Sequence, residues 1–306
     1  MPPSGDAGDP APADVSLFFQ TLVNGLLVGG LYVTISIGFS LAFGVLDVVD
    51  FAVGEWVMLG AFVGVAWHSW FDVDPFATLP VTFVVFAGAG LLLAPLIYRV
   101  RTSRYVRPAL MALAFTFGIA TFARGAMLTA VGFDPRTVQT GFAEGTLSVA
   151  GLEIPWLRVA GFGFAVAATG LFLVFLYFTR TGLAVRATAQ DKENAGLMGV
   201  DVKRISTLVY ALYAGLTGMA GVLIGSIYAV TAQIGPQYAL LAFFVVVLAG
   251  LGSVLGVLVA GLLLGVLQAL VTVYVGASYT LGVVFAVLFL TLIVSPRGIL
   301  RRGMAA

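Results

Sequence analysis

Long apolar runs separated by short polar stretches dominate this chain. They cover residues 17–46, 51–70, 76–98, 108–131, 159–178, 205–230, 238–249, 254–275 and 279–294. Most of them contain about 20 residues, the length with which an α-helix crosses a hydrocarbon core of about 30 Å. The run 238–249 is shorter and predicts a broken or re-entrant helix, which is stable at membrane depth only where protein shields it. The pattern therefore predicts an all-α, polytopic membrane protein with about eight to nine membrane segments.

Composition agrees with this class of protein. Of the 306 residues, 60% are hydrophobic and 9% are charged, whereas a soluble domain carries about 25% charged residues. A soluble globular protein is therefore excluded. The net charge of +1 gives no indication of a nucleic-acid partner, and the lack of cysteine excludes disulfides and thiolate chemistry. Residues 1–16, rich in Pro, Gly, Ala and Asp, predict a disordered tail, which leaves residues 17–306 as the transmembrane domain.

The basic residues predict the orientation in the membrane. The loop 99–107 carries four of them, the central loop 180–206 five and the tail 297–302 three, so these regions hold 12 of the 15 Lys and Arg residues. By the positive-inside rule all three regions lie on the cytoplasmic side. The turn-rich segment 132–158, which has some strand-like alternation, is then an outer loop. Acidic residues count little in this rule, so the side of the N-terminus stays open.

The central loop is polar and helical in pattern. It predicts a helix from Gly182 to Met198 that ends at Gly199 as a C-cap, with Asp201 as the N-cap of the next helix. Apolar contact positions alternate in it with polar ones; the apolar ones are Leu183, Ala187, Ala195 and Met198. Two interpretations remain open, a solvated amphipathic helix and a surface that binds another protein.

Three charged residues fall near or within apolar runs, namely Asp50, Glu55 and Arg124. Such residues are costly in a membrane and usually face a cavity or a partner group. They line a transport path that meets a substrate ammonium group, or they form bonds between helices without a role in transport. One of the two acids is a candidate counter-ion for Arg124. Asn24 and Tyr32 are further candidates for the lining of a path.

Motifs for catalysis are absent from the sequence. There is no G-x-x-x-x-G-K-[ST] phosphate-binding loop, so this chain is not expected to hydrolyse ATP. A single histidine cannot build a metal site, and the arrangement G-x-S-x-G of serine hydrolases does not occur. We therefore expect no enzyme, no catalytic residue and no metal.

Glycine pairs of the form G-x-x-x-G recur along the apolar runs. They are Gly25/Gly29, Gly60/Gly64, Gly221/Gly225, Gly252/Gly256 and Gly261/Gly265. Small residues four positions apart allow helix backbones to approach closely, which is a main source of helix association in lipid. We expect these pairs to lie at contacts between helices.

The segment GLAVRATAQDKENAGLMGVD, residues 182–201, resembles the cytoplasmic coupling motif of ABC-importer permeases. It is similar in particular to the branched-chain amino-acid permease family, in its LivH-type rather than its LivM-type branch. The opening segment NGLLVGGLYVTISIGFSLAFGVLDVVDFAVGEWVMLGA, the stretch LLAFFVVVLAGLGSVLGVLVAGLLLG and the closing SPRGIL show the same resemblance in the same order. The resemblance thus covers nearly the whole chain after residue 16.

The resemblance implies the permease subunit of an ATP-driven importer in a prokaryotic cell membrane. Its expected partners are two ATPase subunits, a second and LivM-like permease chain, and an extracytoplasmic substrate-binding protein. ATP and Mg²⁺ would bind in the ATPases, and no cofactor would bind in this chain. The coupling helix would contact an ATPase through residues that match the family motif, namely Gly182, Arg186, Asp191, Ala195 and Gly199.

One departure from the family pattern concerns the substrate. The family usually has Asn-Phe-Ala-His-Gly-Glu where this chain has Asp50-Phe51-Ala52-Val53-Gly54-Glu55. The change leaves the fold unaffected but opens alternatives to branched-chain amino acids, namely urea, short amides or sugars. A different class of function is a stand-alone secondary transporter or channel that uses Asp50, Glu55 and Arg124 as its ion-coupling charges.

Overall fold

A computed structural model describes residues 11–103, 107–137, 145–149, 152–250 and 252–295. The helices are α1 (Ala11–Leu46), α2 (Val53–Phe71), α3 (Leu79–Arg101), α4 (Pro108–Val131), α5 (Trp156–Phe178), α6 (Arg180–Gln190), α7 (Lys192–Leu197), α8 (Val202–Ile227), α9 (Gly235–Ala249), α10 (Val254–Tyr274) and α11 (Thr280–Val294). Strands β1 (Thr146–Val149) and β2 (Leu152–Pro155) form an antiparallel hairpin in the predicted outer loop. The all-α, polytopic class is confirmed.

Seven helices in the described ranges are long and apolar enough to cross a membrane: α1, α3, α4, α5, α8, α10 and α11. Here α11 is counted together with the 3-10 turn Ala277–Tyr279 that precedes it, which gives a continuous stretch of 18 residues, Ala277–Val294. The 15-residue α9 is shorter, and α2 carries Glu55 and His68 within 19 residues. The predicted total of eight to nine membrane segments depends on how α2 and α9 are counted, and stays a prediction.

The first helix begins earlier than the composition predicts. Residues 11–16 were expected to belong to a disordered tail, but they form the start of α1. Pro12 is compatible with this position because a proline in the first helical turn has no backbone N–H bond to lose. The rest of the predicted tail, residues 1–10, lies outside the described residues.

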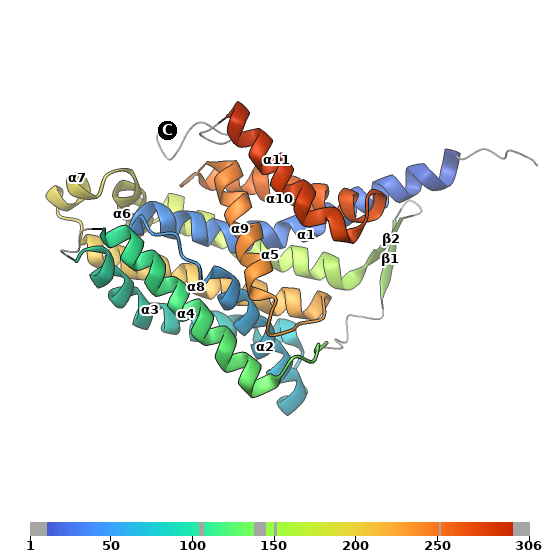
Figure 1. The fold of residues 1–306 in the computed structure, drawn as a ribbon, viewed down its shortest axis with the longest axis horizontal. Coiled ribbons are helices and arrows are strands. Elements are labelled where there is room, and N and C mark those ends of the chain that lie inside the picture. The colour runs from blue at the N-terminus through green and yellow to red at the C-terminus, as the bar shows by residue number, and fades with distance from the viewer. Residues whose placement is uncertain (1–10, 104–106, 138–144, 150–151, 251, 296–306) are drawn as a thin grey trace, which may run out of the picture.

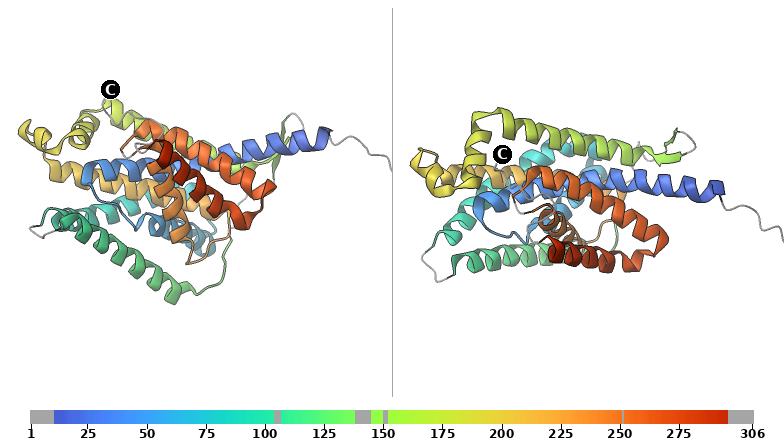
Figure 2. Two further views of the ribbon diagram at one scale, coloured as in Figure 1. Left: turned by 45° about the horizontal axis from the view of Figure 1, so that its top comes forward. Right: turned by 90° about the horizontal axis from the view of Figure 1, so that it is seen from above.

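The helix bundle is elongated, and most long helices follow its long axis (Figure 1). Among the candidate spans, α1 and α8 are the most buried, and α4 and α11 the least. The short helix α9 is an exception, because it lies across the direction of the long helices in all the views of Figures 1 and 2. The core is therefore built on α1 and α8, with α4 and α11 at the periphery.

Close glycine contacts hold the core helices together. A Cβ at Gly29 would lie 2.9 Å from the Cα of Leu262 on α10. A Cβ at Gly90 would lie 2.8 Å from the Cα of Ala211 on α8. Four of the five predicted glycine pairs lie at such helix contacts, as expected. The exception is Gly252/Gly256, where Gly252 has φ +81° and a Cβ added to it would meet nothing within 4 Å. That glycine serves the turn before α10.

The two ends of the bundle agree with the predicted orientation. At one end Asp47 forms ion pairs with Arg101, at 3.7 Å, and with Lys192, which brings the loop 99–107 and the central loop together. At the other end Gln20 of α1 donates a hydrogen bond of 2.9 Å to the backbone oxygen of Glu153 in the hairpin. The start of α1 therefore lies on the predicted outer side. The basic tail 297–302 lies outside the described residues.

Candidate functional site

Two helices, α2 and α9, begin inside the bundle. The chain leaves the end of α1 and returns through the segment 47–52, in which Val48, Asp50 and Ala52 are buried. α2 then starts beside the second half of α8, because Val57 packs against Gly221. The start of α9 touches the start of α2, where Gly54 is in direct contact with the backbone of Gly235. Irregular backbone at this depth is tolerated because protein surrounds it.

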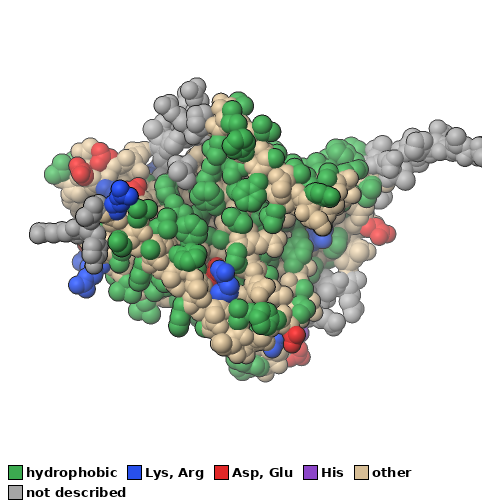
Figure 3. Space-filling model, viewed as in Figure 1, with side chains coloured by type: hydrophobic (Ala, Val, Ile, Leu, Met, Phe, Trp, Pro, Cys, Tyr) green, Lys and Arg blue, Asp and Glu red, His purple; other side chains and the backbone are tan. Residues whose placement is uncertain are grey.

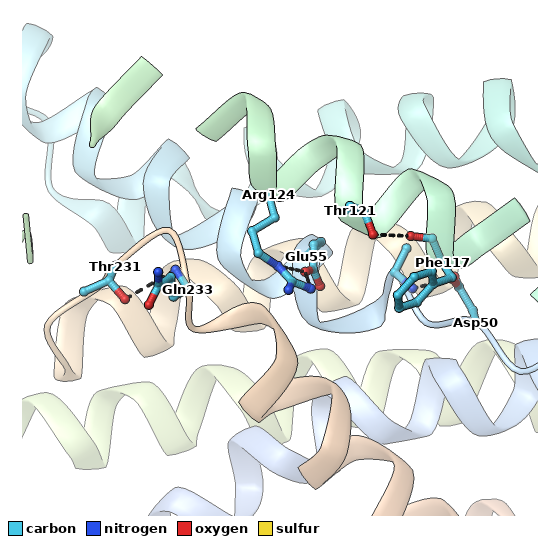
Figure 4. A network of polar contacts seen from close by, with 8 residues as sticks. Asp50, Glu55, Phe117, Thr121, Arg124, Thr231 and Gln233 are labelled. Atoms are coloured by element: carbon cyan, nitrogen blue, oxygen red, sulfur yellow. Dashed lines mark hydrogen bonds and ion pairs between the residues drawn. The ribbon is translucent and has the colours of Figure 1, made fainter. Parts of the chain in front are cut away.

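Glu55 is the charged centre of this junction. Its Oε1 accepts hydrogen bonds from Nε and Nη2 of Arg124, at 2.9 and 2.5 Å (Figure 4). It stands in the first turn of α2, and a Cβ on Gly235 would lie 2.7 Å from its carboxylate. The positive ends of two helix dipoles and one guanidinium therefore stabilise this carboxylate. Its Oε2 is buried and has no hydrogen-bond partner among the described residues.

The predicted counter-ion of Arg124 is thus confirmed as Glu55. The Glu55 side chain is only 2% exposed, whereas that of Arg124 is 32% exposed. Figure 4 shows Arg124 pointing from α4 towards α2, past the loop that leads into α9. The pair therefore links the peripheral helix α4 to the junction of the two broken helices.

Asp50 is bonded entirely within the chain. Its Oδ2 accepts a hydrogen bond of 2.8 Å from the Tyr210 hydroxyl, and its Oδ1 accepts one of 2.8 Å from the backbone N–H of Ala52. The residue is 4% exposed. These bonds anchor the segment 47–52 to α8, so the contacts of Asp50 fit the interpretation as a bond between elements. A role in transport stays a prediction.

Asn24 and Tyr32, the other two predicted path residues, lie in a separate place. They line a cavity of about 480 Å³, here called the outer cavity, between α1, α10, the start of α5 and the segment 228–238. Tyr32 donates a hydrogen bond of 2.5 Å to Oε1 of Gln268 there. The remaining lining residues are Thr21, Val28, Arg158, Tyr228, Ala229, Ile234, Gln237, Tyr238, Gly265, Ala269, Thr272 and Val273. The five predicted path residues thus form two groups.

The coupling segment is two helices instead of the single helix predicted from Gly182 to Met198. The break falls at Asp191, which is extended at φ −155° and accepts hydrogen bonds of 3.0 Å from the N–H groups of Glu193 and Asn194. An aspartate side chain competes for backbone N–H groups in this way and favours a cap over a helix interior. Asp191, one of the predicted ATPase contacts, therefore determines the shape of the loop.

The predicted caps after this break are confirmed. Gly199 has φ +88°, the N–H of Val200 bonds to the oxygen of Ala195 and that of Gly199 to the oxygen of Gly196. This is a Schellman motif, which requires the left-handed conformation that glycine adopts at low cost. Asp201 accepts a hydrogen bond of 3.0 Å from the N–H of Arg204 and caps α8.

The five predicted coupling residues have different environments. Gly182 packs against the backbone at the end of α5, and Ala195 is buried. Arg186 lies 4.9 Å above the ring of Tyr177, while Asp191 and Gly199 are exposed. The two buried residues hold the loop in shape. The exposed apolar surface consists of Leu183, Leu197 and Met198, which are 60%, 84% and 86% exposed.

A model of the family described as "Branched-chain amino acid transport system / permease component" matches residues 21–292. The chain belongs to this family. The permease protein LivH of a high-affinity branched-chain amino acid transport system from Salmonella typhimurium is 30% identical over 93% of this chain and 96% of its own length. BraD of Pseudomonas aeruginosa gives the same values, and a probable LivH of Methanocaldococcus jannaschii is 26% identical over 91% of each chain. No solved structure gives a significant match.

Membership of the permease family agrees with the helices described above. The chain is a multi-pass protein of the cell membrane and a transport component, a class of subunit that is not enzymatic. Sequence reasoning missed Arg158 and Gln268 in the outer cavity. Gln268 could have been found as the one amide within the apolar run 254–275, whereas nothing in the pattern shows that Arg158 lies near it.

Proposed function

We propose that this permease is the membrane subunit of an ATP-driven importer of branched-chain amino acids. The observation that carries the proposal is the family match over residues 21–292, together with relatives named for branched-chain amino acid transport. Two ATPase subunits, a second and LivM-like permease chain and an external binding protein complete the importer. Docking of the binding protein outside and closure of the ATPases inside would then alternate the access to a central path.

The helices α6 and α7 support the assignment of the ATPase contact. They lie at one end of the bundle (Figure 1), where Leu197 and Met198 are 84% and 86% exposed on a polar loop. Adjacent large apolar side chains on such a loop favour a binding surface for another protein. ATP and Mg²⁺ would bind in that partner, because this chain lacks a phosphate-binding loop.

The face between α4 and α9 supports a second permease chain. Arg124 is partly exposed there, and Phe117 and Phe122 on the same helix are 56% and 77% exposed. Figure 3 shows hydrophobic side chains over most of this side of the molecule, with most charged groups at its two ends. A guanidinium in contact with lipid tails is costly. We infer that protein rather than lipid covers Arg124, and that the transport path runs beside this face.

A stand-alone secondary transporter has less support. It would use Asp50, Glu55 and Arg124 as ion-coupling charges, but Glu55 and Arg124 neutralise each other and Asp50 is bonded to Tyr210. The contacts that these charges make within the chain are sufficient to explain their presence.

Reconstitution in proteoliposomes tests the proposed function. The chain is combined with the ATPases, the second permease and the binding protein of the proposed importer, and uptake of labelled leucine is measured with and without ATP. We expect uptake that requires ATP and the binding protein, with competition by isoleucine and valine but none by urea, acetamide or ribose. Uptake by the chain alone along an ion gradient would show a secondary transporter, and competition by urea or ribose would change the substrate.

The exposed apolar pair at the end of α7, Leu197 and Met198, gives a prediction for the ATPase contact. Replacing both Leu197 and Met198 with serine removes apolar surface but leaves the caps at Asp191 and Gly199 intact. We expect the purified variant to capture at least tenfold less ATPase in a pull-down, because about 2 kcal/mol of apolar burial is lost at the interface. The control is the double replacement of Trp70 and Phe133, which are 77% and 70% exposed in α2 and after α4. Equal capture by both variants would place the contact elsewhere.

A further inference from the structure

The outer cavity contains a positive charge without a counter-ion. Arg158 is half-buried in the first turn of α5, and it forms no ion pair within the described part of the chain. It is the only charged residue among the described residues that line the cavity. A partly buried guanidinium without a negative partner is unfavourable, because it has lost part of its hydration. Its position favours a ligand that brings the negative charge.

The helix that carries Arg158 strengthens this preference. α5 has 23 residues, begins at Trp156 and has no acidic residue in its first turn. The positive end of its dipole therefore lies beside the guanidinium, an arrangement that is unfavourable for a cation but favourable for an anion that binds both. The helix dipole and the Arg158 guanidinium therefore both favour an anionic ligand group.

The opposite wall offers neutral polar groups and apolar surface. The Tyr32 hydroxyl bonds to Oε1 of Gln268, which orients the Gln268 side chain and leaves its amide N–H groups as donors. The side-chain oxygen of Asn24 is buried and has no hydrogen-bond partner in the described ranges. Val28 and Ile234 add apolar lining. A cavity of about 480 Å³ lies in the usual range for small-molecule sites, roughly 300–1,000 Å³.

We propose that the outer cavity is a transit site for the transported amino acid, with the guanidinium of Arg158 binding its carboxylate. Arginine suits this task because its planar fork can donate two parallel hydrogen bonds to one carboxylate. Asn24 and the Tyr32–Gln268 pair bound the site on the side of α1 and α10, and the apolar lining accepts an aliphatic side chain. The inference rests on the proposed function and adds to it a binding site on this chain, separate from that of the binding protein.

Direct binding tests the site. The importer, assembled from the chain, the second permease and the ATPases but without the binding protein, is titrated with labelled leucine. Unlabelled competitors are leucinol, which lacks the carboxylate, 4-methylpentanoate, which lacks the ammonium group, and inorganic phosphate. The variants are Arg158→Gln and Arg158→Lys. The matched control is Arg136→Gln, an exposed arginine on the same side of the molecule that does not line the outer cavity.

We expect leucine to bind the wild type and to be displaced by 4-methylpentanoate but not by leucinol or phosphate. Arg158→Gln should weaken binding roughly tenfold to a hundredfold, the usual loss for a charged hydrogen bond. Arg158→Lys should weaken leucine binding less than Arg158→Gln does, and Arg136→Gln should bind leucine with the affinity of the wild type. If Arg158→Gln does not assemble, the competitor pattern of the wild type and Arg158→Lys decides the question.

Three outcomes would overturn the inference. In the first, phosphate displaces leucine as well as 4-methylpentanoate does, which shows a general anion site. In the second, Arg158→Gln leaves leucine affinity and ATP-driven uptake unchanged. In the third, Arg158→Gln leaves leucine affinity unchanged but abolishes the stimulation of ATP hydrolysis by the binding protein. Arg158 would then be a residue that docks the binding protein. The proposed function would stand in all three cases, because it is tested separately by the uptake assay on the complete wild-type importer.

Discussion

Replacing Gly54 with alanine is expected to destabilise the permease by about 3 kcal/mol, the upper part of the usual range for overpacking. The added Cβ would overlap the backbone carbonyl of Gly235 and lie 2.9 Å from the N of Ala239. These are backbone atoms of α9, so rotation of a side chain cannot relieve the clash. α2 and α9 would have to separate, and Glu55 would lose its place between the two helix starts.

Gly118→Ala is the matched control, because Gly118 lies in α4 and a Cβ there meets nothing within 4 Å. Alanine is favoured over glycine in a helix by about 1 kcal/mol, so intrinsic propensity would stabilise both variants. The measurement is the temperature at which half of the detergent-solubilised protein is lost from the monodisperse peak in size-exclusion chromatography. Equal temperatures for the two variants would contradict the close contact of α2 with α9.

Replacing Arg124 with methionine is expected to have an effect of similar size. It leaves the carboxylate of Glu55, whose side chain is 2% exposed, without its counter-ion, and breaking a buried pair in this way costs about 3–5 kcal/mol. Because Arg124 is itself 32% exposed, we expect a value near the lower limit. The same chromatographic assay measures it.

A double variant separates the charge from the shape of the side chains. Glu55→Gln combined with Arg124→Met removes both charges, and we expect it to recover most of the lost stability, as replaced ion pairs often do. Arg136→Met, at an exposed arginine without an ion pair among the described residues, should be close to wild type. If the double variant is no more stable than Arg124→Met, loss of packing and not an unpaired charge explains the effect.

The sequence pattern located the spans because length and hydropathy decide what crosses a bilayer. α4 begins at Pro108 and ends at Val131, as predicted, and the caps at Gly199 and Asp201 follow from local chemistry. The break at Asp191 was missed although its cause is equally local. The residue was interpreted as a contact position, whereas its side chain bonds to the next backbone N–H groups.

The candidate sites were harder to predict because they join distant parts of the chain. An acidic partner for Arg124 could be predicted, since a charge in apolar surroundings has few possible partners, but the sequence left both Asp50 and Glu55 as candidates and only the structure selects Glu55. Asn24, Arg158 and Gln268 meet only because α1, α5 and α10 pack around one cavity. No periodicity in the sequence states which helices are neighbours, so the polar residues of the path were predicted as one group but lie in two.

The crosswise position of α9 has a consequence for biosynthesis. A helix of 15 residues is about 22 Å long, too short for a hydrocarbon core of about 30 Å. Its start packs on α2, made long before it, and it also contacts α10, made after it. The segment therefore cannot make all of its final contacts as it leaves the ribosome. The contacts of α9 are complete only when α10 has been synthesised and α2 is in place beside it.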